Sequence, residues 1–413
     1  MEKIYGLIGN PLGHSFSPQI HAGLGDYIYK LFPIEEDEVG AFLMKREFEA
    51  INVTIPYKQT VMPYCDRIAP EALAIGSVNT IVKEADGTLS GYNTDYFGFK
   101  MMLERAGIDP RGRKCLVLGS GGSSKTARCV LRDMGAGSVT VISRSGEDNY
   151  ENIGKHSDAE LIVNTTPVGM YPKNGASAVD LTVFPRLAGV ADLIYNPEKT
   201  ALLLQAERLG IPFTGGLYML VAQGAKASEF FLRTTYDEGV IERVYNEVNL
   251  RMRNITLVGM PGCGKSSVGR AIAEMLGREL VDCDEYITER YGISPADIIT
   301  KRGEPEFRRI EHEALAELTK RSGLVLSTGG GCVTVPENHP LLRQNGRVVF
   351  INRDISLLAT DGRPLSVGGA DRLAMMYEKR LPLYRAVCDI ETETGVGSVI
   401  AETARRICEL LGY

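Results

Sequence analysis

One local pattern occurs twice in this chain and constrains its fold more than any other feature. An apolar run leads through a glycine turn into an amphipathic helix in KCLVLGSGGSSKTARCVLRDMG, residues 114–135, and again in NITLVGMPGCGKSSVGRAIAEMLG, residues 254–277. Such strand–loop–helix units are typical of nucleotide sites in folds with parallel sheets. Because about 120 residues separate the two units, the sequence predicts two separate nucleotide sites.

The composition is that of a multidomain globular protein. A chain of 413 residues suggests two to four domains. A net charge of −6 argues against nucleic acid as the main partner, because backbone-phosphate binding needs a concentrated basic surface. No apolar run approaches the roughly 20 residues that cross a bilayer, and the first residues lack a signal core. We therefore expect small-molecule partners, neither nucleic acid nor membrane, and a homo-oligomer remains compatible with the sequence.

The cysteines indicate a reducing compartment. Eight are dispersed along the chain, at positions 65, 115, 129, 263, 283, 332, 388 and 408. None forms a C-x-x-C pair, and the five histidines offer no zinc-type spacing around them. Dispersed thiols in a large chain favour the cytoplasm.

Short apolar strands alternate with amphipathic helices along the whole chain, which predicts an α/β fold with largely parallel sheets. Residues 217–250 have the periodicity of two amphipathic helices. A charged stretch, 249–254, follows them and precedes the second glycine unit. We place the main domain boundary there.

The first glycine loop has the spacing of a dinucleotide site. Its glycines allow a pyrophosphate to approach the backbone, and the helix that follows supplies amide donors and a partial positive charge. The alternative for this short motif is a tight strand-to-helix turn. The loop positions are Gly119, Ser120, Gly121, Gly122 and Ser123.

The end of the next strand favours NADP over NAD. An NAD site usually places an acidic residue there to bind the ribose 2′-hydroxyl. This chain has Ser143, Arg144 and Ser145, and an arginine flanked by hydroxyls suits a 2′-phosphate. Glu147 and Asp148 lie close by and are evidence in the other direction.

The second glycine loop fits G-x-x-x-x-G-K-[ST] and predicts a site for ATP and Mg²⁺. Loop amides cradle the phosphates, Lys265 reaches the transferred group and the Ser266 hydroxyl ligates the metal. Cys263 fits as an incidental small residue. The remaining loop positions are Gly262, Gly264 and Ser267.

Ordered motifs over residues 1 to about 250 closely resemble shikimate dehydrogenase. They are GNPLGHSFSPQIH (9–21), NVTIPYK (52–58), GSVNT (76–80), GYNTDYFG (91–98), LIYNPEKTALL (193–203) and GGLYMLVAQ (215–223). The resemblance implies a substrate-binding domain of residues 1–96 with 217–250, and an NADP domain of residues 97–216. It also implies that the chain reduces 3-dehydroshikimate to shikimate.

The resemblance assigns Lys58 and Asp95 as the catalytic pair, with the lysine passing a proton to the oxygen that becomes an alkoxide. Without it, Lys58 is more simply a solvated surface residue and Asp95 a helix N-cap. The implied substrate-binding positions are Ser15, Ser17, Asn52, Thr54, Asn79, Tyr195 and Gln223, and the further cofactor positions are Leu193, Gly216 and Met219. Tyr195 and Met219 fit core packing equally well.

Residues 254–413 are similar to shikimate kinase. The resemblance lies in VDCDEYI (281–287), GEPEFRRIEHE (303–313), STGGGCV (327–333), GRPL (362–365) and KRLPLYR (379–385). It implies that Asp282 helps to hold Mg²⁺ through water and that Asp284 contacts the acceptor hydroxyl and serves as base. Transfer of a phosphoryl group from ATP to shikimate is the implied reaction.

The same resemblance assigns the remaining kinase residues. Arg308 and Arg380 clamp the substrate carboxylate, work that suits bidentate guanidinium geometry. Arg363 closes on the phosphates as part of a glycine-rich lid. A glycine run, Gly329, Gly330 and Gly331, lets the backbone approach the ring.

The chain departs from the two families in three places. The segment between Gln19 and Asn52 is short, so a strand–helix pair is expected to be trimmed. Gly215 stands where an aspartate is common. Thr360 stands where related kinases carry an arginine against the adenine, and Arg405 or Arg406 is a candidate replacement.

The expected protein is thus a bifunctional enzyme of the shikimate pathway that uses NADPH and Mg-ATP. A sensor built from decayed copies of both enzymes is disfavoured, because Lys58, Asp95, Lys265 and Asp284 are all present. A nearer alternative keeps both folds but changes the substrate to quinate or another small polyol acid.

Overall fold

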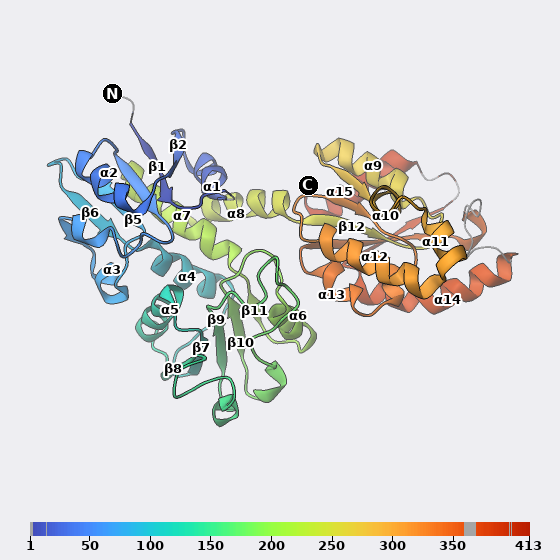
Figure 1. Cartoon of the computed structure of the whole chain (residues 1–413), viewed down its shortest axis with the longest axis horizontal. Helices are drawn as coiled ribbons and strands as arrows, with labels where there is room; N and C mark the ends of the chain where they lie inside the picture. The colour runs from blue at the N-terminus through green and yellow to red at the C-terminus, as the bar shows by residue number, and fades with distance from the viewer. Residues whose placement is uncertain (1–2, 14, 359–368, 396, 398) are drawn as a thin grey trace. The chain divides into compact units, whose positions relative to one another are not determined.

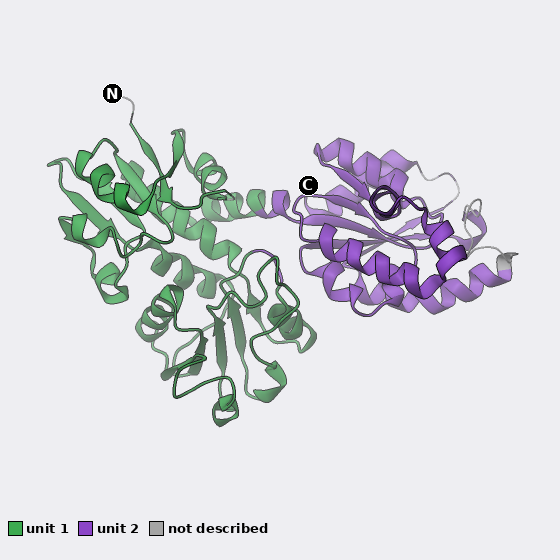
Figure 2. Cartoon of the chain, in the orientation of Figure 1, with its two compact units in different colours: residues 1–195, 200–248 green, residues 196–199, 249–413 purple. Residues whose placement is uncertain are grey.

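The computed structural model (Figure 1) describes residues 3–13, 15–358, 369–395, 397 and 399–413. The chain forms two compact units (Figure 2). The first contains residues 1–195 and 200–248, and the second contains residues 196–199 and 249–413. Each unit is described by itself below.

The first unit begins with a mixed six-stranded sheet of order β2-β1-β3-β5-β6-β4. Its parallel part, in which β1 lies between β2 and β3, puts two strand ends beside one another at one edge. Strand β5 runs antiparallel to both β3 and β6. The strands are β1 (Tyr5–Gly9), β2 (Tyr29–Pro33), β3 (Ala50–Val53), β4 (Arg67–Ile68), β5 (Thr80–Lys83) and β6 (Leu89–Tyr92), and the helices are α1 (Ser17–Leu24), α2 (Val39–Lys45) and α3 (Pro70–Ile75).

The short segment after Gln19 keeps its strand–helix pair. Both β2 and α2 lie within it, and β2 pairs with β1 over five residues, from Tyr5 opposite Tyr29 to Gly9 opposite Pro33. Val39 and Leu43 of α2 are fully buried in the core of this sheet. The strand and the helix are both present, and both are short: β2 has five residues and α2 has seven.

A second sheet in this unit is wholly parallel, with the order β11-β10-β9-β7-β8. Its central strands are continuous runs of buried apolar residues, as expected where helices cover both faces. Because the strands are parallel, the loops after β7 and β8 emerge at the same edge. The elements are β7 (Lys114–Leu118), α5 (Gly122–Asp133), β8 (Ser138–Ile142), β9 (Leu161–Asn164), β10 (Gly189–Asp192), α6 (Ala201–Arg208) and β11 (Phe213–Thr214).

The two amphipathic helices predicted over 217–250 are confirmed as α7 (Leu217–Leu232) and α8 (Glu238–Met252). Helix α7 packs against α4 (Thr94–Arg105) so closely that Gly98 of α4 has no room for a side chain. A Cβ on Gly98 would lie 2.6 Å from the carbonyl oxygen of Met219. The boundary between the two units falls within α8, after Val248.

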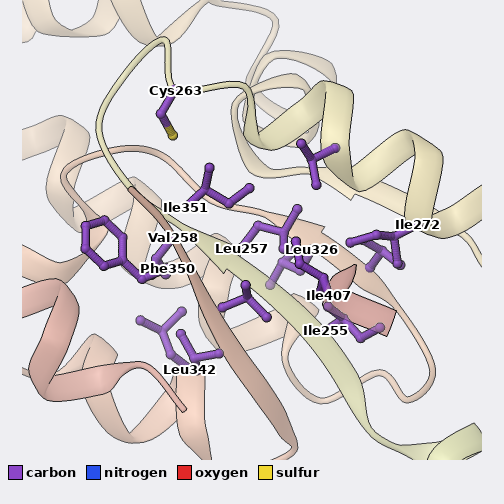
Figure 3. Packing of buried hydrophobic residues seen from close by; sticks show 14 of the residues in the cluster. Ile255, Leu257, Val258, Cys263, Ile272, Leu326, Leu342, Phe350, Ile351 and Ile407 are labelled. Carbon is purple, nitrogen blue, oxygen red and sulfur yellow. The ribbon is translucent and has the colours of Figure 1, made fainter. Parts of the chain in front are cut away.

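The second unit is built on one parallel sheet of order β13-β14-β12-β15-β16. Its main core cluster lies around β12 and β15 and includes the fully buried Leu257, Phe350 and Ile351 (Figure 3). The strands are β12 (Asn254–Val258), β13 (Leu280–Asp282), β14 (Val325–Ser327), β15 (Gly346–Arg353) and β16 (Ile390–Thr394). The helices are α9 (Lys265–Leu276), α10 (Cys283–Tyr291), α11 (Pro295–Arg302), α12 (Glu304–Leu318), α13 (Asn338–Arg343), α14 (Gly369–Val387) and α15 (Ile400–Leu411).

Short 3-10 turns are also present: η1 (Glu36–Glu38), η2 (Met62–Tyr64), η3 (Ile153–His156), η4 (Leu181–Val183), η5 (Cys332–Thr334) and η6 (Ile355–Leu357).

The predicted α/β class is confirmed in both units. Within the described residues, no helix combines the length and apolar character that a bilayer span requires.

Replacing Gly98 by alanine tests the α4–α7 contact. Alanine normally stabilises a helix relative to glycine by about 1 kcal/mol, but here its methyl group would overlap Met219 and crowd Gln223. We expect Gly98→Ala to lower the free energy of unfolding of the first unit by about 1–3 kcal/mol in urea titrations. Gly154→Ala, where nothing lies within 4 Å of the added Cβ, is the control. A stabilised Gly98→Ala variant would show that the helices do not pack as described.

Candidate active sites

A cavity of about 390 Å³ lies in the first unit between the loop after β1, the end of β3 and α7. It is lined by every substrate-binding side chain that the sequence suggested, together with Lys58: Ser15, Ser17, Asn52, Thr54, Asn79, Tyr195 and Gln223. These residues come from segments as far apart as 15 and 223 in the chain. The fold therefore brings the whole set to one cavity.

Lys58 and Asp95 form a close ion pair beside this cavity. Lys58 Nζ donates to Asp95 Oδ2 at 2.6 Å, and both side chains are largely buried, with 27% and 15% exposed. Asp95 lies in the first turn of α4, where the helix dipole favours a negative charge. The Asp95 carboxylate is thus stabilised both by the Lys58 ammonium and by the N-terminus of α4. In turn, it holds the Lys58 amine in one position.

Hydrogen bonds with residues of β5, α4 and α7 fix the orientation of the Asn79 amide. Its Oδ1 accepts from the backbone N–H of Thr94 at 2.7 Å and from Thr80 Oγ1 at 3.1 Å, and its Nδ2 donates to Gln223 Oε1 at 3.4 Å. The oxygen is therefore occupied by the protein. One N–H of the amide remains to meet a ligand.

Asn52 is oriented in the same way. Its Nδ2 donates to Thr80 Oγ1 at 3.0 Å, and its Oδ1 accepts from Tyr29 OH at 2.8 Å. The sequence indicated Asn52 and Asn79 but not Thr80, Thr94 or Tyr29, since their pairing depends on strand register.

His21 lines the back of the cavity but is not a proton donor at neutral pH. It is 1% exposed, its ring stacks on that of Tyr29 at 4.0 Å between centroids, and its Nδ1 is hydrogen-bonded to Tyr27 OH. Burial lowers the pKa of His21 to about 3. Among the described residues that line this cavity, Lys58 is the one lysine or arginine.

Two aromatic rings lie at the edge of the cavity. Phe16 and Tyr195 meet edge to face, with centroids 6.0 Å apart, and burial raises the pKa of the tyrosine. Met219 is one turn before Gln223 on α7 and does not line the cavity. It remains a predicted neighbour of the cofactor.

The glycine loop after β7 has the open backbone that a pyrophosphate requires. Gly119 adopts a φ of +101°, and a Cβ there would come within 2.9 Å of Thr166. Nothing lies within 4 Å of the Cβ positions of Gly121 and Gly122, where α5 begins. The amides at the start of α5 are thus accessible to an anion.

The segment after β8 lies next to this loop, because Leu118 of β7 is paired with Ile142 of β8. Arg144 is exposed there. The carboxylate of Asp148, which argued against NADP, is engaged elsewhere, since its Oδ1 lies 2.8 Å from His156 Nε2. The exposed cation that follows β8 therefore lies near the glycine loop, and its contact with a 2′-phosphate stays a prediction.

A buried carboxylate shapes the loop after β10. Asp192 is fully buried and accepts hydrogen bonds from Thr200 Oγ1 at 2.7 Å, Asn164 Nδ2 at 3.0 Å and the backbone N–H of Ile194 at 3.0 Å. Burial is the main cause that raises the pKa of Asp192 to about 6. The sequence did not identify this group.

The same loop requires a glycine at position 216. A Cβ on Gly216 would lie 2.1 Å from the carbonyl oxygen of Leu193. The predicted cofactor positions Leu193 and Gly216 are therefore in backbone contact. Tyr195, two residues after Leu193, lines the substrate cavity.

The second unit contains a cavity of about 660 Å³ at the carboxyl edge of its sheet. It is lined by most of the predicted kinase residues: Gly262, Gly264, Lys265, Ser266, Ser267, Asp282, Asp284, Arg308, Gly329, Gly330, Gly331 and Arg380. Cys263 instead turns its side chain into the core beneath the loop (Figure 3). Arg363 and Thr360 lie outside the described residues.

The P-loop side chains are hydrogen-bonded to the backbone of their own loop and to Asp282 at the end of β13. Lys265 Nζ donates to the carbonyl oxygens of Gly259 and Met260 at 2.9 and 3.0 Å. Ser266 Oγ donates to Asp282 Oδ2 at 2.6 Å, while Asp282 Oδ1 caps α10. Hydroxyl and carboxylate are thus adjacent, as a shared Mg²⁺ with water ligands would need.

The two predicted clamp arginines converge on the glycine run. Arg380 Nη1 donates to the carbonyl oxygen of Gly330 at 3.1 Å, and Tyr384 OH donates to the same oxygen. Arg308 lies so close to Gly331 that a Cβ there would meet its guanidinium at 2.0 Å. The glycines are needed for this convergence.

Arg308 is held by two carboxylates on its own helix. It pairs with Glu304 at 2.9 Å and with Glu311 at 2.6 Å. Glu311 is fully buried, and burial raises its pKa against the opposing effect of Arg308. Sequence reasoning passed over Glu311, although its i+3 spacing from Arg308 was an available signal.

Comparison with known proteins gives matches in both units. Residues 7–81 match the family model of the shikimate dehydrogenase substrate binding domain, and residues 261–411 match that of shikimate kinase. The shikimate dehydrogenase (NADP(+)) of Clostridium perfringens strain SM101 is 39% identical over 270 residues, covering 60% of this chain and 99% of that protein. That of Geobacter sp. strain M21 is 39% identical over 274 residues, covering 58% and 93%. The chain belongs to the shikimate dehydrogenase family, and a shikimate kinase domain follows in the same chain.

Solved structures of the dehydrogenase family show the same fold. A chorismate mutase/shikimate 5-dehydrogenase fusion protein from Clostridium acetobutylicum is 36% identical with a TM-score of 0.57, covering 60% of this chain and 97% of that one. Shikimate 5-dehydrogenase from Thermus thermophilus, in complex with NADP(H) and shikimate, is 30% identical with a TM-score of 0.53, covering 59% and 99%.

The arginines suggested as replacements near the adenine do not reach the kinase cavity. Arg405 and Arg406 are exposed on α15, and neither lines it. Arg353, which the sequence did not single out, does.

Asp192 gives the dehydrogenase unit a pH dependence of known sign. Its folded pKa of about 6 exceeds the ordinary 3.8, so the folded state binds the proton more tightly. Protonation of Asp192 contributes roughly 3 kcal/mol to the free energy of unfolding below about pH 4. This contribution is lost as the pH rises through about 6. Asp192→Asn cannot titrate. We expect the difference in unfolding free energy, wild type minus variant, to fall over this interval in denaturant titrations; parallel profiles would contradict the assignment.

Proposed function

We propose that this chain reduces 3-dehydroshikimate to shikimate with NADPH and phosphorylates shikimate to shikimate 3-phosphate with Mg-ATP. Residues 1–253 carry the first reaction, with 1–96 and 217–250 for substrate and 97–216 for NADP, and residues 254–413 carry the second. The observation that carries the proposal is the Lys58–Asp95 pair, 2.6 Å apart beside a cavity lined with amide and hydroxyl groups.

The polar lining suits a polyhydroxylated carboxylate. The hydroxyls of Ser15, just before α1, and of Ser17, its first residue, are donors for the carboxylate, and Ser15 Oγ accepts from the Ser17 amide at 3.2 Å. The fixed amides of Asn52, Asn79 and Gln223 bind ring hydroxyls. Each of these groups is oriented before a ligand arrives, which lowers the entropic cost of binding.

Lys58 is the proton donor in this proposal. NADPH, when bound, supplies the hydride for the keto carbon. As negative charge develops on the oxygen, the Lys58 ammonium stabilises it and transfers a proton, while Asp95 keeps the amine in position. The nearby imidazole of His21 does not compete for this role, because its low pKa leaves it neutral.

The kinase cavity suits transfer to a hydroxyl of the same acid. Arg308 and Arg380 bind the substrate carboxylate beside the glycine run, and Asp284 accepts the hydroxyl proton. Lys265 and the loop amides neutralise the phosphates. Ser266 and Asp282 would hold Mg²⁺, which would supply positive charge to the phosphates.

These two reactions are consecutive if shikimate is the shared ligand, which places the protein in aromatic amino-acid biosynthesis. We further place it in the cytoplasm. None of its eight cysteines forms a disulfide, as expected where thiols stay reduced.

The direct test supplies 3-dehydroshikimate with NADPH or NADH, with and without Mg-ATP, and identifies the products. We expect shikimate without ATP and its phosphate with ATP. Steady-state rates with quinate measure the alternative substrate. A preference for quinate in the first reaction, or failure of shikimate as kinase substrate, would overturn the shared-substrate proposal.

Each lysine should control one reaction. Lys58→Ala removes the proton donor, so we expect kcat of dehydrogenation to fall about 10²- to 10⁴-fold with the kinase near normal. Lys265→Ala should abolish phosphoryl transfer and leave dehydrogenation near normal. Both activities are measured spectrophotometrically on the same preparation of each variant, so that each variant is the control for the other. Loss of both activities in either variant would contradict two independent sites.

Arg144 should set the choice of dinucleotide. We expect Arg144→Gln to raise KM for NADPH about 10-fold or more, the worth of a charge-assisted hydrogen bond, with KM for NADH unchanged. Arg132→Gln, at an exposed arginine of α5, is the matched control. Equal effects on NADPH and NADH would place Arg144 away from the 2′-phosphate.

A further inference from the structure

The inference concerns Arg353, the last residue of β15, which lines the kinase cavity together with Lys265 and Ser266. Strand β15 runs parallel to β12, the strand that leads into the P-loop, with Val258 opposite Phe350. The two chains stay close as they leave the sheet. A Cβ on Gly259 would lie 2.5 Å from the carbonyl oxygen of Ile351.

The alternation of side chains along β15 directs Arg353 to the P-loop face. Phe350 stacks on Tyr384 of α14, and Asn352 accepts a hydrogen bond from Tyr377 of the same helix at 3.0 Å. Successive side chains of a strand point to opposite faces, so Ile351 and Arg353 face the other way. Figure 3 shows Ile351 on the side of β15 toward Cys263, with Phe350 on the opposite side.

The guanidinium reaches the start of α9. Arg353 Nη1 lies 3.8 Å from the Cβ position of Gly264, the residue before Lys265. Gly264 has a φ of +100° and no side chain. The guanidinium of Arg353 therefore approaches the P-loop at the residue just before Lys265.

The charge of Arg353 is not neutralised within the described part of the chain. Its Nε is buried and finds no hydrogen-bond acceptor there, and no carboxylate of those residues lies within ion-pair distance. The adjacent carboxylate is used locally, since Asp354 Oδ1 accepts from Ser356 N and Oγ at 2.9 and 2.6 Å. A buried donor without an acceptor is costly unless a ligand completes it.

The position of β15 in the sheet indicates which ligand that is. Of the proposed acceptor groups, Asp284 and the glycine run follow β13 and β14, which lie on one side of β12, whereas β15 lies on the other. Arg380 reaches the glycine run from α14. We propose that Arg353 binds the phosphate chain of the nucleotide, on the side of the P-loop away from the acceptor. This inference rests on the proposed kinase function.

Arg353→Met in the full-length chain tests it, because methionine keeps bulk and removes charge. We expect KM for Mg-ATP to rise about 10- to 100-fold, the loss of a charge-assisted hydrogen bond, and KM for shikimate to stay within about 2-fold. Inorganic tripolyphosphate, which has the phosphate chain without the nucleoside, should lose affinity as an ATP competitor by a similar factor. Arg405→Met, at an exposed arginine that does not line the cavity, is the control and should match wild type.

The outcomes separate this inference from the function on which it rests. A wild-type chain that fails to phosphorylate shikimate overturns the proposed function itself. An active wild type with unchanged KM for Mg-ATP in Arg353→Met overturns only the role of Arg353. A raised KM with unchanged tripolyphosphate inhibition overturns the phosphate contact. If Arg353→Met is inactive, calorimetric titration of Arg353→Gln with tripolyphosphate decides, and a wild-type Kd refutes the proposal.

Discussion

Both active sites depend on points where the backbone comes closer to another segment than any side chain would allow. Gly98 lets α4 contact the backbone of α7, which carries Gln223. Gly216 lets its segment contact Leu193, two residues before Tyr195. Gly331 makes room for the Arg308 guanidinium. Since a Cβ at any of these positions would overlap its neighbour, the glycines determine the distances on which the chemistry depends.

Within the frame that these contacts set, buried polar groups fix the orientation of the functional side chains. Asn79 has its oxygen occupied by Thr80 and Thr94, so its amide can present only N–H to a ligand. Asp192 uses three donors to fix the loop that carries Tyr195. In a low dielectric such networks are stable only when nearly every member is satisfied. This explains why the residues behind the catalytic ones are as constrained as the catalytic ones themselves.

The sequence predicted what is encoded locally. Short motifs contain the glycine loops, the α7–α8 pair and the cavity-lining residues. The spacing of residues within each motif can be recognised in the sequence without knowing the fold. Thr80 and Thr94 escaped notice because their role arises from the antiparallel pairing of β3 with β5 and from the start of α4. Arg353 escaped for a similar reason, since only the register of β15 on β12 brings it to the P-loop. The short segment after Gln19 was expected to have a trimmed strand–helix pair. Both β2 and α2 are present, because a strand and a helix can shorten without disappearing.

The pairing of Arg308 with Glu304 and Glu311 has a further consequence, because all three residues lie on α12. Successive residues of a helix are rotated by about 100°, so a one-residue insertion or deletion between them would swing the guanidinium away from the glycine run. Side-chain substitutions nearby leave that phase intact. The number of residues between Glu304 and Glu311 is therefore fixed by the geometry of the site. Over evolutionary time, we expect insertions and deletions in the kinase half to occur around α12 but not within this stretch.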